Sequence, residues 1–329
     1  MQGRDIMAVV GIDKLIFGVE NMKEAQKFYN DFGLKTVREK ADSSIYRTAN
    51  QAEIEVRPMR AKGMPKPIQG GSTLRELIWG VETKADLKKI ASELKKDRAV
   101  TIDKDGTVHS TSPCGLGIAF RVTHRIKLPR KVIPMNSPEL VSRVDERAIY
   151  YKAATPLTVG HVVLNVPDVN AEADFYIKRI GFYLTDIYRG RGKFLRTKQE
   201  AGHHQLFLLE DDQASLNHVG FGVRDINEMI GGGYKMQRAG WPVAVGPGRH
   251  IVSSCYFWYF KAPVGGANEY FCDEDYCTKN WKPKVWDPAP ETFAEWLLPK
   301  GIVGKRPQPP TRTKKDMVKK PATKAKKAA

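Results

Sequence analysis

The chain has 329 residues, of which 41% are hydrophobic and 28% are charged. This length exceeds the ~250–300 residues at which single cores stop growing, so the first expectation is two domains. No run of the sequence approaches the ~18 apolar residues of a membrane-spanning helix, which argues against a membrane protein.

The charge is unevenly distributed along the chain. The net charge is +17, but residues 305–329 contribute ten Lys or Arg against one acid, Asp316. This segment contains prolines and no hydrophobic periodicity, and is expected to be a disordered basic tail. A solubilising role is favoured over non-specific binding to nucleic acid or anionic surfaces, and no specific nucleic-acid partner is expected.

Cysteine usage and the first residues indicate the compartment. No CxxC pair occurs among Cys114, Cys255, Cys272 and Cys277, which argues against both a zinc finger and a disulfide framework. The first residues carry no secretory signal pattern. We therefore expect reduced thiols and a cytoplasmic protein.

An internal duplication organises the chain. Three pairs of segments match between the halves: 10–29 with 157–176, 74–94 with 216–236, and 112–122 with 262–272. The first two pairs read as an apolar strand that runs into a helix, and the third as closing strands with a Pro-Gly turn. Each half is therefore expected to hold two strand-and-helix modules, four in the chain.

The matched segments, with the proline-rich stretch between them, set the expected boundaries. The expected divisions are an N-terminal domain at 8–130, a linker at 131–156, a C-terminal domain at 157–280, an arm or lid at 281–304, and the basic tail at 305–329.

Three polar residues distinguish the second half from the first. Matching the halves places His161 over Lys14, His218 over Glu76, and Glu269 over Ala119. Two imidazoles and one carboxylate can hold a divalent iron on one face and leave other coordination positions free. Zinc accepts the same ligands, so the residues alone leave the metal open.

Further polar residues follow in the second half, and their pattern is specific. The stretch from residue 248 to residue 269 resembles the signature of type I extradiol ring-cleavage dioxygenases, in the vicinal oxygen chelate superfamily. The residues that carry the resemblance are Gly248, Arg249, His250, Trp258, Tyr259, Ala262, Pro263, Gly265 and Glu269. Trp258 departs from the pattern, which has an aliphatic residue or Phe there.

The resemblance covers roughly residues 8–300 and implies an α+β fold of two tandem domains. Each domain would consist of paired βαβββ modules that form a curved sheet around a cavity, with a non-catalytic first domain and a catalytic second one. It implies metal ligands at His161, His218 and Glu269, with Fe(II) expected and Mn(II) possible. It also implies a substituted catechol as substrate, O2 as co-substrate, both oxygen atoms inserted, and a homo-oligomer.

The resemblance also assigns roles to residues around the metal. His204 is the expected acid–base residue, because it lies fourteen positions before His218 as in the family, while the adjacent His203 is ambiguous and is kept as a substrate contact. His250 and Tyr259 are expected to bind the substrate oxygens.

Fewer residues indicate which substituent the substrate carries. Val245 stands where relatives that act on homoprotocatechuate have an arginine, which argues against a carboxylate at that contact. Phe257 and Trp258 are expected to contact the substrate, and a further set of aromatic residues would suit an apolar substituent: Tyr270, Trp281 and Trp286.

Two other functions remain open for the same fold. A metal-dependent lyase or isomerase of the glyoxalase type would usually lack the group His204, His250 and Tyr259. A non-enzymatic small-molecule-binding protein would not need the ligand set His161, His218 and Glu269.

Overall fold

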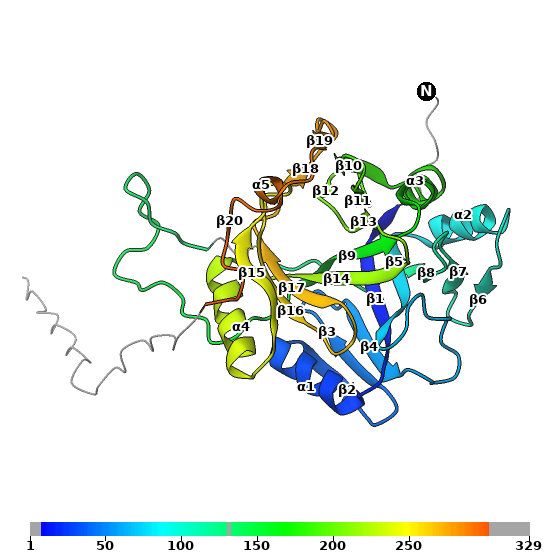
Figure 1. Cartoon of the computed structure of the whole chain (residues 1–329), viewed down its shortest axis with the longest axis horizontal. Helices are drawn as coiled ribbons and strands as arrows, with labels where there is room; N and C mark the ends of the chain where they lie inside the picture. Colours follow the sequence, from blue (N-terminus) through cyan, green and yellow to red (C-terminus); the bar gives the residue numbers. More distant parts are fainter. Residues whose placement is uncertain (1–7, 130–132, 303–329) are drawn as a thin grey trace, which may run out of the picture.

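Two curved sheets form the body of the protein in the computed structural model, which describes residues 8–129 and 133–302 (Figure 1). The first sheet contains, from edge to edge, β2 (Lys35–Glu39), β3 (Ser44–Arg47), β4 (Glu53–Pro58), β1 (Val9–Val19), β5 (Thr73–Val81), β8 (Gly117–Val122), β7 (Val108–Thr111) and β6 (Thr101–Ile102). All of these strands come from the first half of the chain. The expected α+β architecture of two tandem domains is confirmed.

The second sheet is built from the second half. It contains, from edge to edge, β19 (Val285–Trp286), β10 (Tyr183–Tyr188), β11 (Gly192–Arg196), β13 (Leu206–Glu210), β9 (Thr158–Val166), β14 (Ser215–Gly222), β17 (Ala267–Cys272), β16 (Tyr256–Lys261), β15 (Val243–Arg249) and β20 (Trp296–Leu297). A separate two-stranded sheet pairs β12 (Ala201–Gly202) with β18 (Tyr276–Cys277).

The turns that lead into the first four helices each carry a side chain that caps the helix. The helices are α1 (Met22–Phe32), α2 (Lys84–Leu94), α3 (Val169–Asp174), α4 (Ile226–Arg238) and the short α5 (Pro290–Phe293). Asn21, Thr83, Asp168 and Asp225 each accept a backbone N–H of the first turn in α1 to α4, which satisfies a donor that the helix itself cannot. The helix expected after 168 continues from α3 as one turn of π-helix, η1 (Phe175–Ile180).

Strand registers reproduce the offsets of the duplication. In the first sheet Ile78 lies opposite Lys14 on β1 and Ala119 on β8. In the second sheet Gly220 lies opposite His161 on β9 and Glu269 on β17. Lys14, Ile78 and Ala119 are thus the counterparts of His161, Gly220 and Glu269 in space as well as in sequence.

The two halves share one continuous core of buried residues. Tyr270 stacks on Phe32 of α1 with ring centroids 4.1 Å apart, and its hydroxyl donates to the Phe32 carbonyl at 2.7 Å. Trp241 packs edge-on against Phe28 and donates to Asp31 at 2.9 Å. Aromatic contacts and hydrogen bonds therefore join α1 to the second half.

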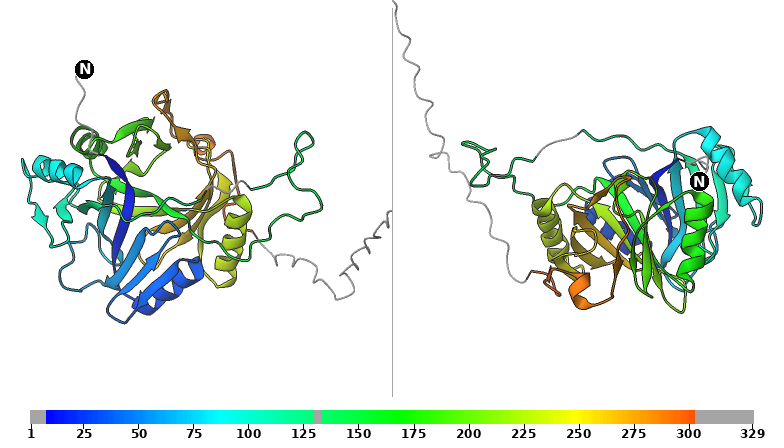
Figure 2. Two further views of the ribbon diagram at one scale, coloured as in Figure 1. Left: turned by 180° about the vertical axis from the view of Figure 1, so that it is seen from behind. Right: turned by 90° about the horizontal axis from the view of Figure 1, so that it is seen from above.

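Two segments lie outside this body of paired modules. Residues 133–152 contain no helix or strand, and Figure 2 shows them running away from the sheets between β8 and β9. Residues 281–302, the expected arm, add β19 beside β10 and β20 beside β15, with α5 between them. None of the described helices is long and apolar enough to cross a membrane.

Candidate active site

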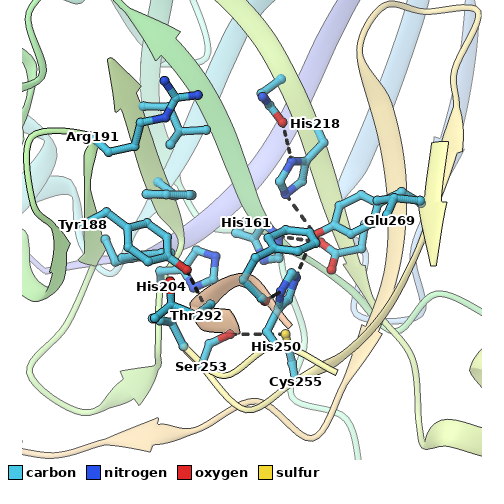
Figure 3. A pocket seen from close by; sticks show the side chains of 18 of the residues that line it. His161, Tyr188, Arg191, His204, His218, His250, Ser253, Cys255, Glu269 and Thr292 are labelled. Atoms are coloured by element: carbon cyan, nitrogen blue, oxygen red, sulfur yellow. Dashed lines mark hydrogen bonds and ion pairs between the residues drawn. The ribbon is translucent and has the colours of Figure 1, made fainter. Parts of the chain in front are cut away.

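Three adjacent strands in the middle of the second sheet bring two histidines and a glutamate together (Figure 3). His161 of β9 lies with Nε2 2.8 Å from Oε2 of Glu269 on β17. His218 of β14 has its Nε2 3.5 Å from the same oxygen. Glu269 is 0% exposed and His161 2%, so the cluster sits at the bottom of a cavity, away from bulk water.

A glycine makes room for this cluster. Gly220 faces both His161 and Glu269, and a Cβ atom there would lie 2.3 Å from Nε2 of His161. The counterpart in the first half is Ile78, and there Lys14 pairs with Glu55 at 2.6 Å. In the first sheet the side chain of Ile78 and this ion pair thus fill the space that remains open in the second sheet.

The protonation states of the cluster are those that a metal requires. Burial lowers the pKa of His218 to about 3, so its imidazole is neutral near pH 7. Burial raises the pKa of Glu269, but the neighbouring His161 and His218 outweigh that effect and hold it below its usual value. The neutral imidazole of His218 and the ionised carboxylate of Glu269 can coordinate a metal without losing a proton first.

An unpaired carboxylate oxygen also fits a bound cation. Oε1 of Glu269 is buried without a hydrogen-bond partner in the described chain, and a buried carboxylate is costly unless a positive charge or hydrogen bonds compensate it. Nδ1 of His218 donates to Oδ1 of Asn217 at 2.8 Å. This bond leaves the lone pair of the other nitrogen pointing at Glu269, as in many metal-binding histidines.

Two other groups of the described residues have potential ligand atoms within 4.8 Å of one another: His161, His204 and Glu274, and His250, Cys255 and Glu269. Each shares one residue with the central cluster, so they cannot all bind separate ions. In the central cluster the unpaired oxygen of Glu269, and the Asn217 bond that orients His218, favour coordination. We therefore regard His161, His218 and Glu269 as the candidate metal ligands.

His250 and Tyr259 form a hydrogen-bonded pair on another wall of the cavity. Nδ1 of His250 donates to the carbonyl of Phe293 at 2.8 Å, so its Nε2 accepts from the Tyr259 hydroxyl at 3.0 Å. Burial lowers the pKa of His250, which keeps the ring neutral and supports these roles. Phe293 belongs to α5, so the arm helps to orient the pair.

His204 lies beside the cluster, and its side chain lines the cavity. Its ring is 4.4 Å from that of His161 between centroids. Burial, followed by the neighbouring histidines, lowers its pKa far below the usual value. His204 precedes the start of β13 and lies in the connection from β12.

The cavity has a volume of about 400 Å³ and is lined in part by residues of the arm. Its walls are largely apolar and include Tyr188, Phe194, Phe207, Leu209, Val245, Val252 and Phe293. Arg191 also lines it, from the turn between β10 and β11. No described residue forms an ion pair with this guanidinium, which makes it a free cation at the cavity wall.

Several residues expected to contact the substrate do not line the cavity. Trp258 points to the opposite face of the sheet and packs against α4, because neighbouring residues of a strand alternate in direction. Phe257 shares the face of Tyr259 but lies stacked behind His250, with centroids 3.9 Å apart. His203 is 0% exposed and lies behind His204, away from the cavity.

The other expected aromatic residues are also engaged elsewhere. Tyr270 packs between the two halves, while Trp281 and Trp286 donate to Asp186 on β10 at 3.4 and 2.8 Å. The aromatic walls come instead from Tyr188, Phe194, Phe207 and Phe293. Val245 is the expected substrate contact that does line the cavity.

Sequence reasoning missed Asn217, Arg191 and Asp186. Asn217 directly precedes a predicted ligand, and that adjacency could have pointed to it. Arg191 lies in a Gly-Arg-Gly turn of ordinary composition, and Asp186 on an apolar strand. Neither position carries a signal without the fold.

Comparison with known proteins matches residues 158–270 to the model of the Glyoxalase/Bleomycin resistance protein/Dioxygenase superfamily. A curated relative, metapyrocatechase 2 of Cupriavidus necator, is 34% identical over 121 residues, which are 37% of this chain and 38% of the relative. The matched part thus spans well under half the length of that protein.

Solved structures share the fold over most of the chain. The Mn(II)-bound glyoxalase from Novosphingobium aromaticivorans has a TM-score of 0.71 at 21% identity, with 89% of this chain and 92% of that chain covered. Homoprotocatechuate 2,3-dioxygenase from Arthrobacter globiformis has a TM-score of 0.71 at 18% identity, with 91% of each chain covered.

Proposed function

We propose that this chain is an extradiol dioxygenase of the Glyoxalase/Bleomycin resistance protein/Dioxygenase superfamily, whose model matches residues 158–270. It would cleave the ring of a substituted catechol beside the diol and insert both atoms of O2. The observation that carries this proposal is the convergence of His161, His218 and Glu269 on one side of a cavity whose other walls present His204, His250 and Tyr259.

Fe(II) is the proposed metal, with Mn(II) as the variant that the same ligands accept. When bound, the metal supplies the redox chemistry toward O2 and lowers the pKa of the substrate hydroxyl. The chain contributes binding, orientation, proton transfer and exclusion of water.

The pair His250 and Tyr259 orients the catechol. The Tyr259 hydroxyl and Nε2 of His250 are 3.0 Å apart at the cavity wall, so a substrate oxygen can exchange for either partner without leaving a buried group unpaired. Holding both hydroxyls in one orientation removes most of the entropic cost of bringing the reactants together. The apolar walls exclude water from the ring during the reaction.

His204 is the proposed acid–base residue. It lines the same cavity beside His161, within reach of a substrate held over the cluster. A neutral imidazole can accept the proton that a catechol hydroxyl releases and return it to an oxygen that develops negative charge.

Arg191 provides the basis for a proposal on the substrate substituent. A cavity of about 400 Å³ lies within the range of pockets that hold molecules larger than one ring. The free guanidinium at its wall favours a substituent that ends in a hydrogen-bond acceptor or a negative charge. Such a group would be bound from the side of Arg191 and not from Val245, where the arginine of some relatives stands.

Assembly and domain division also belong to this proposal. We propose that residues 157–280 form the catalytic domain, that residues 8–130 form a non-catalytic partner, and that the enzyme is a homo-oligomer. The ion pair of Lys14 with Glu55, where the second half has its ligands, supports a first half without a metal.

A glyoxalase-type lyase is the second candidate, because the Mn(II)-bound glyoxalase shares this fold with a TM-score of 0.71. Such an enzyme would bind the same metal without consuming O2. The hydrogen-bonded pair of His250 and Tyr259, with His204 opposite, favours the dioxygenase.

The test is to load the full-length chain with Fe(II) under anaerobic conditions and add a panel of catechols in air. Ring opening is expected to give a yellow product with consumption of one O2 per catechol. An electrode that records no O2 uptake with any catechol, while a hemithioacetal substrate is converted, would favour the lyase. The variant Glu269→Ala should lose both the metal and the activity.

A further inference from the structure

A chain of buried polar groups lies behind His204, on the side away from the cavity. Nδ1 of His204 is 3.1 Å from Nδ1 of His203. Nε2 of His203 faces Oδ2 of Asp186 at 3.5 Å. From another direction, Oε1 of Glu274 lies 3.3 Å from the same Nδ1 of His204.

Asp186 is an acceptor in this chain. The Lys284 backbone N–H donates to one of its oxygens at 2.9 Å, and the Trp286 indole to the other at 2.8 Å. Burial raises the pKa of Asp186, but the bonds from His203 and these donors outweigh it, so the carboxylate is ionised. The Nε2 of His203 lies 3.5 Å from this carboxylate and has no hydrogen-bond partner among the described residues. The negative charge of Asp186 favours a proton, and not a lone pair, on the nitrogen that faces it.

A neutral His203 with its proton on Nε2 has a lone pair on Nδ1. The group that meets this lone pair is Nδ1 of His204. The Oε1 atom of Glu274 already accepts the His204 backbone N–H at 3.3 Å, so this oxygen is an acceptor whether or not the other one is protonated. Two acceptors thus converge on Nδ1 of His204, and that nitrogen must carry a proton.

The opposite nitrogen of His204, Nε2, is not hydrogen-bonded to any described residue, and the side chain lines the cavity. We propose that His203, held by Asp186 and assisted by Glu274, is a positioning residue that fixes His204 as the Nδ1–H tautomer and presents the lone pair of Nε2 to the substrate. This inference rests on the proposed function for its consequence. The His204 ring starts as a base: Nε2 takes the proton from a catechol hydroxyl and later returns it.

The arm takes part in this arrangement. Lys284 and Trp286 belong to it, and both donate to Asp186. Residues 281–286 therefore hold the carboxylate that orients His203. The segment acts on the acid–base residue through two intermediates without contacting the substrate itself.

The tautomer can be measured directly by 15N NMR. The chain has seven histidines, and the signal of His204 is identified by its absence in His204→Gln. Spectra are recorded on the full-length chain after chelation, so that no paramagnetic metal broadens the lines. The expected result is a protonated Nδ1 and an unprotonated Nε2 for His204. A wild-type signal protonated at Nε2 would overturn the proposal.

A matched pair of variants tests the role of His203. His203→Asn keeps an acceptor oxygen at the position of Nδ1, whereas His203→Leu has the same shape without an acceptor. We expect the wild-type tautomer in His203→Asn and a mixture of both in His203→Leu. The kcat of the leucine variant should fall about fivefold, the effect of one net hydrogen bond, with little change in KM.

Identical tautomers in both variants and the wild type would remove His203 from the mechanism. Equal losses of kcat in both variants, with unchanged tautomers, would show a packing role and also contradict the proposal. Since the NMR measurement needs no turnover, a chain that cleaves no catechol would disprove the proposed function and leave the tautomer assignment standing.

Discussion

Gly220 offers the sharpest test of the metal centre, because one methyl group there must collide with a ligand. In Gly220→Ala the new Cβ would lie 2.3 Å from both Nε2 and Cε1 of His161, whereas ordinary contact begins at 3.4 Å. The ring must therefore move by roughly 1 Å, about twice the ~0.5 Å within which a functional constellation has to be held. The rings of His204 and Phe271 lie 4.4 and 4.9 Å from that of His161 between centroids and limit this movement.

Two magnitudes follow from this displacement. Overpacking of this kind typically costs about 1–3 kcal/mol of folding stability. The metal affinity should fall further, by at least the ~10–100-fold that follows the loss of an orienting contact. Isothermal titration with Mn(II) or Fe(II) under anaerobic conditions measures the affinity, and thermal unfolding of the metal-free protein measures the stability.

Gly222→Ala is the matched control on the same strand. Its Cβ would meet Cγ2 of Thr158 at 2.9 Å and no candidate ligand. We expect a comparable loss of stability in the control with a nearly normal metal affinity. If Gly220→Ala bound metal as tightly as the wild type, the ligand role of His161 would be refuted.

Four further outcomes are expected. His204→Phe should keep metal and catechol binding while kcat falls ~10²–10⁴-fold, the usual contribution of a positioned acid or base, as stopped-flow kinetics would show; normal turnover would contradict the role. Arg191→Gln should raise KM about tenfold for catechols with an acidic side chain and leave the KM of neutral catechols unchanged. The control is Arg189→Gln, whose wild-type side chain pairs with an acid outside the cavity, and it should change neither KM. Equal effects of Arg191→Gln on both kinds of substrate would exclude the contact. Asn217→Ala should weaken metal binding ~10-fold by releasing the ring of His218, measured by titration with Mn(II). Acidification should destabilise the metal-free protein, because the pKa of His218 is about 3 in the folded chain and ~6.5 in the unfolded one. As the pH falls from about 6.5 to 3, the unfolded chain binds a proton that the folded chain does not, and the folded state loses stability. A melting temperature that stays constant over this range would contradict the burial of His218.

The sequence predicted much of the fold because the two halves share a pattern of strands and helices and differ in a few polar residues. The sequence offsets between the halves aligned His161 with Lys14 and Glu269 with Ala119. The strand registers place these residues at equivalent positions of the two sheets. The ligand candidates could be recognised because a polar residue on an apolar strand needs a partner. The first half has no such set of ligands at the matching positions, so the three residues of the second half could be singled out.

The cavity walls could not be predicted in the same way. Trp258 and Tyr259 are neighbours in a run of aromatic residues, and composition does not say which faces the cavity, although the alternation along a strand requires that only one does. His203 illustrates the same limit: two adjacent histidines read alike in sequence, and only the fold shows one at the cavity and the other behind it. Arg191 depends on a turn whose direction is set by the pairing of β10 with β11.

The position of Phe293 has a consequence for the order in which the protein matures. Its carbonyl accepts a hydrogen bond from Nδ1 of His250, and the short helix that contains it forms part of the cavity wall. Every histidine and the glutamate are synthesised before this segment. A nascent chain that already contains all of its reactive side chains therefore remains incompetent until α5 docks, and a truncation at residue 285 should yield a folded protein that can take up metal but cannot orient its substrate.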